Sequence, residues 1–189
     1  MPLDVTGSQT VGPFYRIGMA PMYLTELASP EVPGERVTVR GRVLDGDGTP
    51  VPDAILEIWQ ANADGQFSEP QHAQTMLQAG GFSGFGRVPT DDNGAFQFTT
   101  IKPGRVPGPG DMLQAPHLVV LVYMRGLLRH LVTRLYFPDD PANDADPILA
   151  LVPPERRATL IARKAEAGDG TLEWDLHMQG PEETVFFDA

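Results

Sequence analysis

The sequence contains no cysteine, has few positive charges and has no long hydrophobic run. The absence of cysteine from 189 residues excludes disulfide bonds, thiolate metal sites and cysteine nucleophiles, and it fits a reducing compartment. Lysine and arginine number 14 against 25 aspartate and glutamate residues, which gives a formal net charge of −11. Because phosphate groups are bound by clustered cations, we expect no nucleic-acid partner and no anionic membrane surface.

Two further absences concern membranes and export. The longest apolar stretch, LVVLVYM at 118–124, is far too short to span a bilayer. The N-terminal segment MPLDVTGSQTVGPF lacks a basic start followed by an apolar run, so we expect no signal peptide. We therefore predict a cytoplasmic protein.

What the sequence does contain is a series of short segments with period-two or continuous apolar patterning. Val37, Val39 and Val43 alternate with polar residues, as in a half-buried strand. HLVVLVYM at 117–124 is continuously apolar and predicts a strand buried on both faces. Glycine, proline and asparagine turns separate these segments. The predicted strands are 37–43, 54–60, 95–99, 117–124, 129–137, 171–178 and 184–187.

One segment has helical patterning. It follows Pro153 and Pro154, runs over 155–167 and ends at Gly168, in keeping with the preference for proline at helix starts and glycine at helix ends. One short helix among seven or eight strands predicts an all-β fold, a two-sheet β-sandwich. The segments 61–90 and 100–115 carry no period, and loops of that length are usually functional or lie at interfaces.

The chain divides into two parts by composition. Residues 1–34 are rich in proline, glycine and small residues and predict an extended N-terminal arm, followed by a β-sandwich domain at 35–189. The arm carries Phe14, Tyr15 and Tyr23, so it is apolar enough to pack on its own domain or on a partner. Arg36, Arg40 and Arg42 line one strand face, which predicts a solvated face or, as the less favoured reading, a surface for an acidic partner.

The histidines do not form a metal-binding motif. His72, His117, His130 and His177 include no pair with metal-ligand spacing. His117 opens the most apolar strand, where a single histidine is more often a hydrogen-bonded structural residue than a ligand. A zinc site assembled from distant loops stays open, although no feature of the sequence favours one. We find no nucleophile-elbow serine and no phosphate-binding glycine loop.

Several strings, in order along nearly the whole chain, resemble the intradiol ring-cleaving dioxygenases. The strings are GRVLDGDGTPVPDAILEIWQANADGQF at 41–67, GFGRVPTDDNGAFQFTTIKPG at 84–104, APHLVV at 115–120 and TRLYFPDD at 133–140. The opening SQTVGPFY and the closing ETVFFDA resemble the alpha-type chain of two-chain members. This resemblance implies the intradiol-type β-sandwich and ferric-iron chemistry, in which two tyrosinates and two histidines hold the metal.

The positions that correspond to the family's metal ligands are mostly altered in this chain. Phe67 stands where the resemblance implies the first tyrosine, and the segment 102–111, KPGRVPGPGD, contains no tyrosine. The His-x-His pair reads His117-Leu118-Val119, so Val119 replaces the second histidine and His117 is a remnant. A single remaining ligand cannot hold Fe(III), and we therefore expect no metal and no catalytic residue in this chain.

The resemblance implies a partner that supplies what this chain lacks. It implies a homologous beta subunit that holds Fe(III), hetero-oligomers of alpha–beta pairs, and a small aromatic acid substrate. The implied reaction converts protocatechuate (3,4-dihydroxybenzoate) and dioxygen to 3-carboxy-cis,cis-muconate. Carried over by motif, the substrate-binding residues that this chain would lend to the shared pocket are Thr10, Gly12, Pro13 and Arg125. A guanidinium such as that of Arg125 suits a carboxylate, although a strand-end arginine in solvent is the competing interpretation.

Two other functions remain open at the level of sequence. The chain would be a non-enzymatic β-sandwich binding module with a decayed metal site if no partner exists. It would be a self-sufficient enzyme if His72, His117 or His130 held a different metal. Metal analysis of the purified chain and the presence of a four-ligand partner separate these alternatives.

Overall fold

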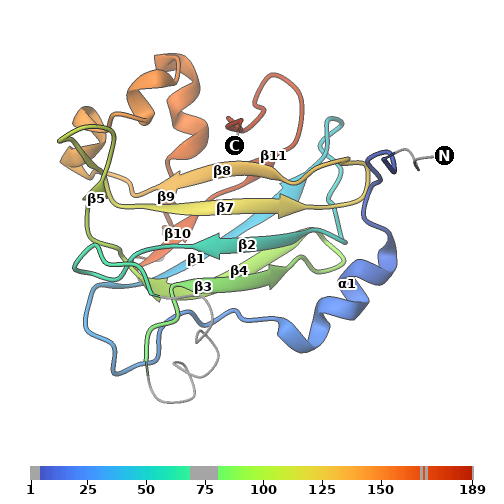
Figure 1. The fold of residues 1–189 in the computed structure, drawn as a ribbon, viewed down its shortest axis with the longest axis horizontal. Coiled ribbons are helices and arrows are strands. Elements are labelled where there is room, and N and C mark those ends of the chain that lie inside the picture. The colour runs from blue at the N-terminus through green and yellow to red at the C-terminus, as the bar shows by residue number, and fades with distance from the viewer. Residues whose placement is uncertain (1–4, 69–80, 167, 169, 189) are drawn as a thin grey trace.

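The computed structural model describes residues 5–68, 81–166, 168 and 170–188 and folds as two β-sheets packed face to face (Figure 1). The first sheet has the order β3-β2-β7-β8, with antiparallel neighbours throughout. Its strands are β3 (Phe85–Pro89), β2 (Ile55–Trp59), β7 (His117–Tyr123) and β8 (Leu131–Tyr136). In the part of the chain described here, no helix is long and apolar enough to cross a membrane.

The second sheet is built around one long strand. Strand β1 (Arg36–Leu44) pairs antiparallel with β4 (Ala95–Ile101) and parallel with β10 (Thr171–Glu173) and β11 (Leu176–His177). Strand β9 (Arg163–Lys164) joins β10 at the edge. A separate hairpin consists of β5 (Val106–Pro107) and β6 (Leu113–Gln114). The predicted two-sheet β-sandwich is confirmed.

The core lies between the two sheets and follows the predicted alternation. Val39 and Val43 of β1 are fully buried, as are Leu118, Val120 and Val122 of β7. The prediction that β7 is buried on both faces is only half right. Val119, Leu121 and Tyr123 on its other face are half-buried, because that face is the outer surface of the first sheet and is covered only in places.

The predicted helix over 155–167 is wrong. A 3₁₀ helix spans Pro154–Leu160 and gives way to β9. Leu160 and Ala162 are both buried, a two-residue spacing that a helix does not provide. Ala162 donates its N–H to the carbonyl oxygen of Tyr136, and β9 adds to β10. Sheet pairing therefore overrides the helical propensity of this segment. Two further 3₁₀ helices precede it, at Pro141–Ala145 and Leu149–Leu151.

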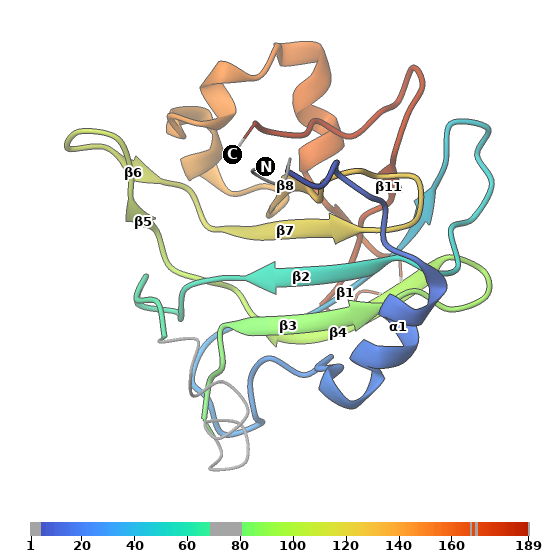
Figure 2. The same ribbon diagram turned by 45° about the vertical axis from the view of Figure 1, so that its right-hand side comes forward.

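The arm is only partly extended, contrary to the sequence-based expectation. It contains an α-helix, α1 (Pro13–Met19), followed by a 3₁₀ helix at Ala20–Met22. Seven residues are too few to show a helical period, which is why the sequence gives no sign of α1. Figures 1 and 2 place α1 at the end of the first sheet where β7 terminates. The division between arm and domain at residue 34 stays a prediction.

The later part of the arm packs on the sandwich and covers a sheet edge. Leu24 exchanges two backbone hydrogen bonds of 2.9 Å with Arg87 of β3, and Leu27 and Ala28 are fully buried. Strand β3 itself was not predicted, because Gly86 and Pro89 are poor residues for the interior of a sheet. An edge strand tolerates both residues, and the arm protects that edge from pairing with other chains. The predicted strand at 184–187 is reduced to a single bridge between Phe187 and Val132.

Candidate functional site

The four residues proposed to bind substrate lie together at one end of the first sheet. The Thr10 hydroxyl oxygen accepts a hydrogen bond of 2.7 Å from the backbone N–H of Gly126, next to Arg125. Gly12 is the N-cap of α1 and Pro13 is its first residue. A single hydrogen bond thus joins the arm to the β7–β8 turn across 116 residues of sequence.

Aromatic contacts hold α1 against this end of the sheet. The ring of Tyr15 lies 5.7 Å from the ring of Tyr123, the last residue of β7. The ring of His130, which follows the β7–β8 turn, lies 5.3 Å from the ring of Tyr123. Burial, together with the negative charge of Glu57, raises the pKa of Tyr123 to about 12, so its phenol stays neutral at physiological pH. Arg16 of α1 donates to the carbonyl oxygen of Thr90 at 2.9 Å. These contacts position Gly12 and Pro13 beside the turn.

Arg125 is exposed and has one acidic neighbour. Its side chain is 67% exposed, and its Nε lies 3.4 Å from Oδ2 of Asp53, whose side chain is 17% exposed. The exposed guanidinium keeps N–H groups free to donate to a ligand. The Asp53 contact could not be predicted from the sequence, since the two residues are 72 positions apart.

The cavity between the arm and the turn is small. Its volume is about 140 Å³, whereas sites that enclose small molecules usually have 300 Å³ or more. Its lining comes from the arm, the end of β7 and the turn, namely Gln9, Val11, Tyr123, Met124, Leu127, Leu128, Arg129 and His130. This cavity is therefore too small to enclose a small molecule, and Thr10, Gly12, Pro13 and Arg125 are not among the residues that line it.

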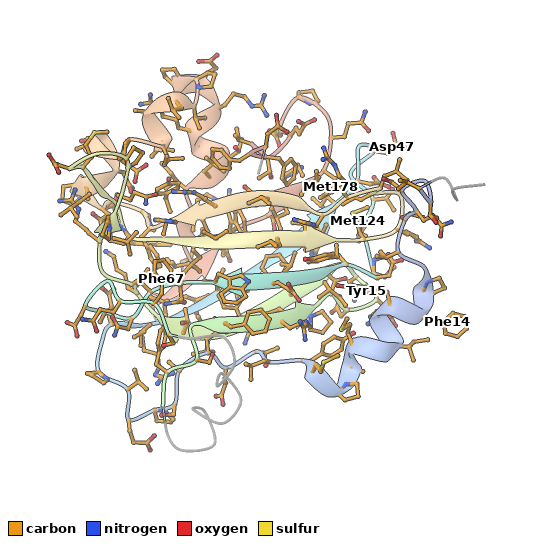
Figure 3. The ribbon with its side chains drawn as sticks, in the orientation of Figure 1. Phe14, Tyr15, Asp47, Phe67, Met124 and Met178 are labelled. Carbon is orange, nitrogen blue, oxygen red and sulfur yellow. The ribbon has the colours of Figure 1, made fainter. Side chains whose placement is uncertain are left out.

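The position that the resemblance assigns to a remnant metal ligand, His117, lies at the opposite end of β7; we refer to it as the remnant position. His117 is the first residue of β7 and Tyr123 is the last, so about 20 Å of strand separates the two ends at roughly 3.3 Å per residue. Figure 3 shows Phe67 at one end of the molecule and Phe14, Tyr15 and Met124 at the other. Thr10 and Arg125 therefore do not face the remnant position of their own chain.

The remnant position does not fit ferric iron. Phe67 has no donor atom and is 61% exposed, and Val119 offers only an apolar side chain. His117 is buried, and its Nδ1 lies 2.8 Å from the carbonyl oxygen of Ala115. Of the residues with described positions, no three histidine, cysteine, aspartate or glutamate side chains come together in a way that could hold a metal.

The other histidines do not join His117. His130 lies at the Tyr123 end of β7, because β8 runs antiparallel to β7 and pairs Leu131 with Val122. His117 and His130 therefore cannot share one metal ion. His177 is a half-buried strand residue on the second sheet, and His72 lies outside the described residues.

A hydrogen-bonded network that the sequence did not reveal surrounds His117. The ring of Tyr136, its neighbour across β7 and β8, lies 5.7 Å away, and the Tyr136 hydroxyl donates to Asp146 at 3.1 Å. Asp146 is fully buried and also accepts from the N–H groups of Ala115, Ile148 and Leu149. No local motif marks these residues, because the β7–β8 register pairs His117 with Tyr136 and the end of the 3₁₀ helix at Pro141–Ala145 brings in Asp146.

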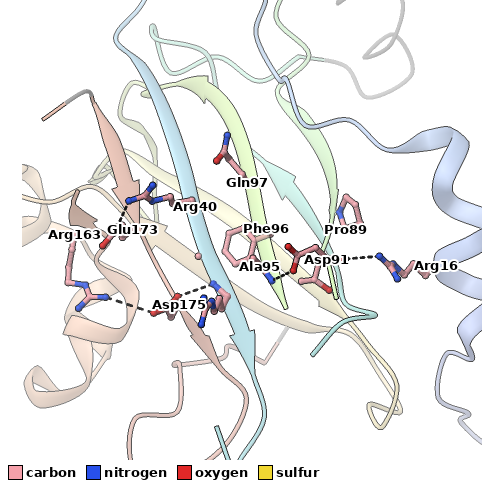
Figure 4. A pocket seen from close by; sticks show the side chains of 13 residues that line it. Arg16, Arg40, Pro89, Asp91, Ala95, Phe96, Gln97, Arg163, Glu173 and Asp175 are labelled. Atoms are coloured by element: carbon pink, nitrogen blue, oxygen red, sulfur yellow. Dashed lines mark hydrogen bonds and ion pairs between the residues drawn. The ribbon is translucent and has the colours of Figure 1, made fainter. Parts of the chain in front are cut away.

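A wide groove runs over the second sheet and reaches Arg16 of α1 and Pro89 of β3, and it is a weaker candidate. It has a volume of about 750 Å³ and contains four arginines and three acidic residues (Figure 4). Arg40 pairs with Glu173 at 2.7 Å, and Arg163 pairs with Asp175 at 3.9 Å. Because most of these charges are satisfied within the chain, the groove has little net charge with which to select a ligand.

His117 should make stability depend on pH. Burial, and then the positive charge of Arg134, lower its pKa from 6.5 to about 4. Between pH 6.5 and pH 4, His117 is protonated in the unfolded chain but stays neutral in the folded chain. The free energy of unfolding therefore falls as the pH drops through this range. We expect wild type to lose on the order of 3 kcal/mol more than His117→Gln between pH 7 and pH 4. Urea denaturation of the full chain measures this difference.

A His177→Gln variant controls for the loss of one histidine from the unfolded chain. Identical pH profiles for wild type and His117→Gln would show that His117 is not held neutral in the fold.

Comparison with known proteins places these features in a family. A family model described as Dioxygenase matches residues 11–180. The chain is 43% identical to the protocatechuate 3,4-dioxygenase alpha chain of Burkholderia cepacia, with 99% of this chain and 98% of that protein covered. It is 38% identical to the alpha chain of the same name from Pseudomonas putida, over the full length of both.

More distant matches include a partner-type chain and a solved structure. The chain is 35% identical to the protocatechuate 3,4-dioxygenase beta chain of Burkholderia cepacia over 80% of this chain and 67% of that one. The dioxygenase domain of a carbohydrate-binding fusion protein from Streptomyces sp. SirexAA-E superposes with a TM-score of 0.64 at 28% identity, covering 86% of this chain and 89% of that one. The chain therefore belongs to the intradiol dioxygenase family and is homologous to the alpha chain of protocatechuate 3,4-dioxygenase.

Proposed function

We propose that this chain is the iron-free alpha subunit of a ferric intradiol dioxygenase, and that it lends one wall to an active site whose iron belongs to a beta subunit. The separation of the two ends of β7 carries this proposal. The remnant metal position lies at His117, and the candidate substrate residues lie beyond Tyr123. Residues that cannot reach their own chain's metal position can serve only a pocket completed by another chain.

The proposed reaction is cleavage of protocatechuate by dioxygen to 3-carboxy-cis,cis-muconate. Ferric iron in the beta subunit supplies the redox chemistry, and this chain contributes binding and shape. The homologous alpha and beta chains named above support an alpha–beta pair, and we extend the proposal to hetero-oligomers of such pairs. A cytoplasmic location stays a prediction that rests on the absence of cysteine.

The role proposed for Arg125 is to orient the carboxylate of the substrate. A net charge of −11 repels an anionic ligand over most of the surface, so a local cation at the pocket wall has a large effect on where the ligand binds. The guanidinium fork matches a carboxylate, and its exposed N–H groups are available. The Thr10 hydroxyl accepts from Gly126 and keeps its own proton to donate. Gly12 and Pro13 shape the wall beside it.

Metal content tests the proposed division of labour. The full chain expressed alone should bind no stoichiometric iron and show no ring cleavage. Co-expressed with a beta subunit, it should give a coloured complex with one iron per alpha–beta pair, measured by elemental analysis and visible absorption. Iron and activity in the chain alone would contradict the proposal, and failure to bind any beta subunit would favour the non-enzymatic binding module.

Replacing Arg125 tests its contact with the carboxylate. In the alpha–beta complex, Arg125→Ala should lower kcat/KM for protocatechuate by roughly 10- to 100-fold, the usual effect of removing a charge-assisted hydrogen bond. Turnover of catechol, which has no carboxylate, should change little. Steady-state oxygen uptake with both substrates measures the two effects.

Arg40→Ala is the matched control, because Arg40 is a surface arginine of the second sheet with its own carboxylate partner. Unchanged kinetics for Arg125→Ala with protocatechuate, or an equal loss with both substrates, would show that Arg125 does not recognise the carboxylate.

A further inference from the structure

Arg134 lies directly beside the remnant metal position. It is the cross-strand partner of Val119 in the β7–β8 register, two positions from the pair formed by His117 and Tyr136. Partners in a sheet project to the same face, and so do alternate residues of one strand. Arg134, Val119 and His117 therefore share the outer face of the first sheet, where a second histidine ligand would stand.

The guanidinium of Arg134 is held in place by neutral groups. Its Nη1 donates to Oε1 of Gln114 at 2.7 Å and to the hydroxyl of Tyr136 at 3.4 Å. Its Cζ lies 5.8 Å from the centre of the Phe187 ring. Among the described residues no carboxylate lies within ion-pair distance of Arg134. The half-buried cation therefore has no direct ion-pair partner among the described residues, and the nearest carboxylate of this network, that of Asp146, is reached only through the Tyr136 hydroxyl.

The partners of Arg134 are themselves anchored. The Nε2–H of Gln114, in β6, donates to the carbonyl oxygen of Pro107, in β5, at 2.7 Å. The Gln114 side chain therefore contacts both strands of the β5–β6 hairpin. Tyr136 is fixed by its hydrogen bond to the buried Asp146. Arg134 thus joins the 105–114 hairpin, which contains β5 and β6 and overlaps the tyrosine-free segment 102–111, to strand β8. The guanidinium is positioned by Gln114 of β6, by Tyr136 of its own strand and by Phe187 near the C-terminus.

A cation at this place opposes the binding of any metal ion there. The positive charge of Arg134 is one of the causes, after burial, of the low pKa of His117, so its field reaches the imidazole. A divalent ion bound between positions 117 and 119 would meet the same repulsion with twice the charge.

We infer that Arg134 is a built-in cation at the vestigial metal position: it fastens the 105–114 hairpin to the sheet, and it keeps metal ions out even where ligands are restored. Two features then prevent iron binding in this chain, namely the missing ligands and the positive charge of Arg134. The position carries a fixed positive charge of its own and is structurally complete without a metal.

The test restores a histidine pair and varies the charge beside it. Val119→His creates two histidines on one strand face, and Co²⁺ binding to the full chain is followed by absorption spectroscopy, since imidazole is a good ligand for this ion. Val119→His alone should bind Co²⁺ weakly. Val119→His combined with Arg134→Met should bind it at least roughly tenfold more tightly.

Two controls isolate the charge at position 134. Arg134→Lys in the Val119→His background keeps the positive charge and should leave Co²⁺ binding weak. Arg40→Met in the same background removes an arginine of the second sheet and should also leave it weak. Equal affinity in Val119→His with and without Arg134→Met would overturn the inference, and so would absence of Co²⁺ binding in both.

The structural half of the inference has its own readout, which does not depend on metal or on activity. Arg134→Met alone should increase amide hydrogen exchange in the 105–114 hairpin, with little change in β1 and β4, as measured by mass spectrometry of the full chain or of the alpha–beta complex. Unchanged exchange in the hairpin would show that Arg134 does not fasten it.

Discussion

Strand β7 sets the distance between the two candidate sites of this chain, the position of His117 and the surface formed by the arm and the β7–β8 turn. It pairs with β2 and β8 along its length and buries Leu118, Val120 and Val122 in the core, so its ends cannot approach each other. His117 stands at one end, and the turn that contains Arg125 and Gly126 follows the other. The rigidity of this strand makes the remnant metal position and the arm–turn surface two separate sites. This separation is the reason we propose that another chain completes a pocket at the arm–turn surface.

Under the proposed function, the His117 end of β7 is a former metal position whose polar groups are bonded within the chain. A buried polar group without a partner is costly, and His117, Asp146 and Arg134 each have a partner from the chain itself. His117 uses the carbonyl oxygen of Ala115, while Asp146 accepts from Tyr136 and from three backbone N–H groups. Arg134 adds a cation bound by Gln114 and Tyr136. These contacts connect the β5–β6 hairpin, the start of β7 and the residue that follows the 3₁₀ segment at Pro141–Ala145.

The sequence predicts the sandwich well because alternation reports burial directly. Val37, Val39 and Val43 point into the core, and so do Phe96 and Phe98. Prediction fails where tertiary pairing decides. The segment 155–167 has helical propensity but contributes β9, and β3 contains Gly86 and Pro89 yet pairs with β2. Helix α1 is too short to show a period.

Some features of the candidate site can be predicted from local sequence motifs, whereas others appear only in the three-dimensional structure. The resemblance rests on local motifs, so the prediction that Phe67 and Val119 replace ligands can be made from the sequence. The contact of Thr10 with Gly126, the pairing of Arg125 with Asp53 and the position of Arg134 opposite Val119 cannot be predicted in this way. The first two join residues far apart in sequence, and the third depends on the alignment of β7 with β8.

A structure of the alpha–beta complex with 3,4-dihydroxybenzoate bound would show directly whether the two chains share one active site. We expect the ligand at the interface, with iron held by the beta subunit and the carboxylate within hydrogen-bond distance of Arg125 of this chain. Thr10, Gly12 and Pro13 should line the same pocket. A ligand or an iron ion at the His117 end of this chain, or a pocket without any residue of the arm and the β7–β8 turn, would contradict it.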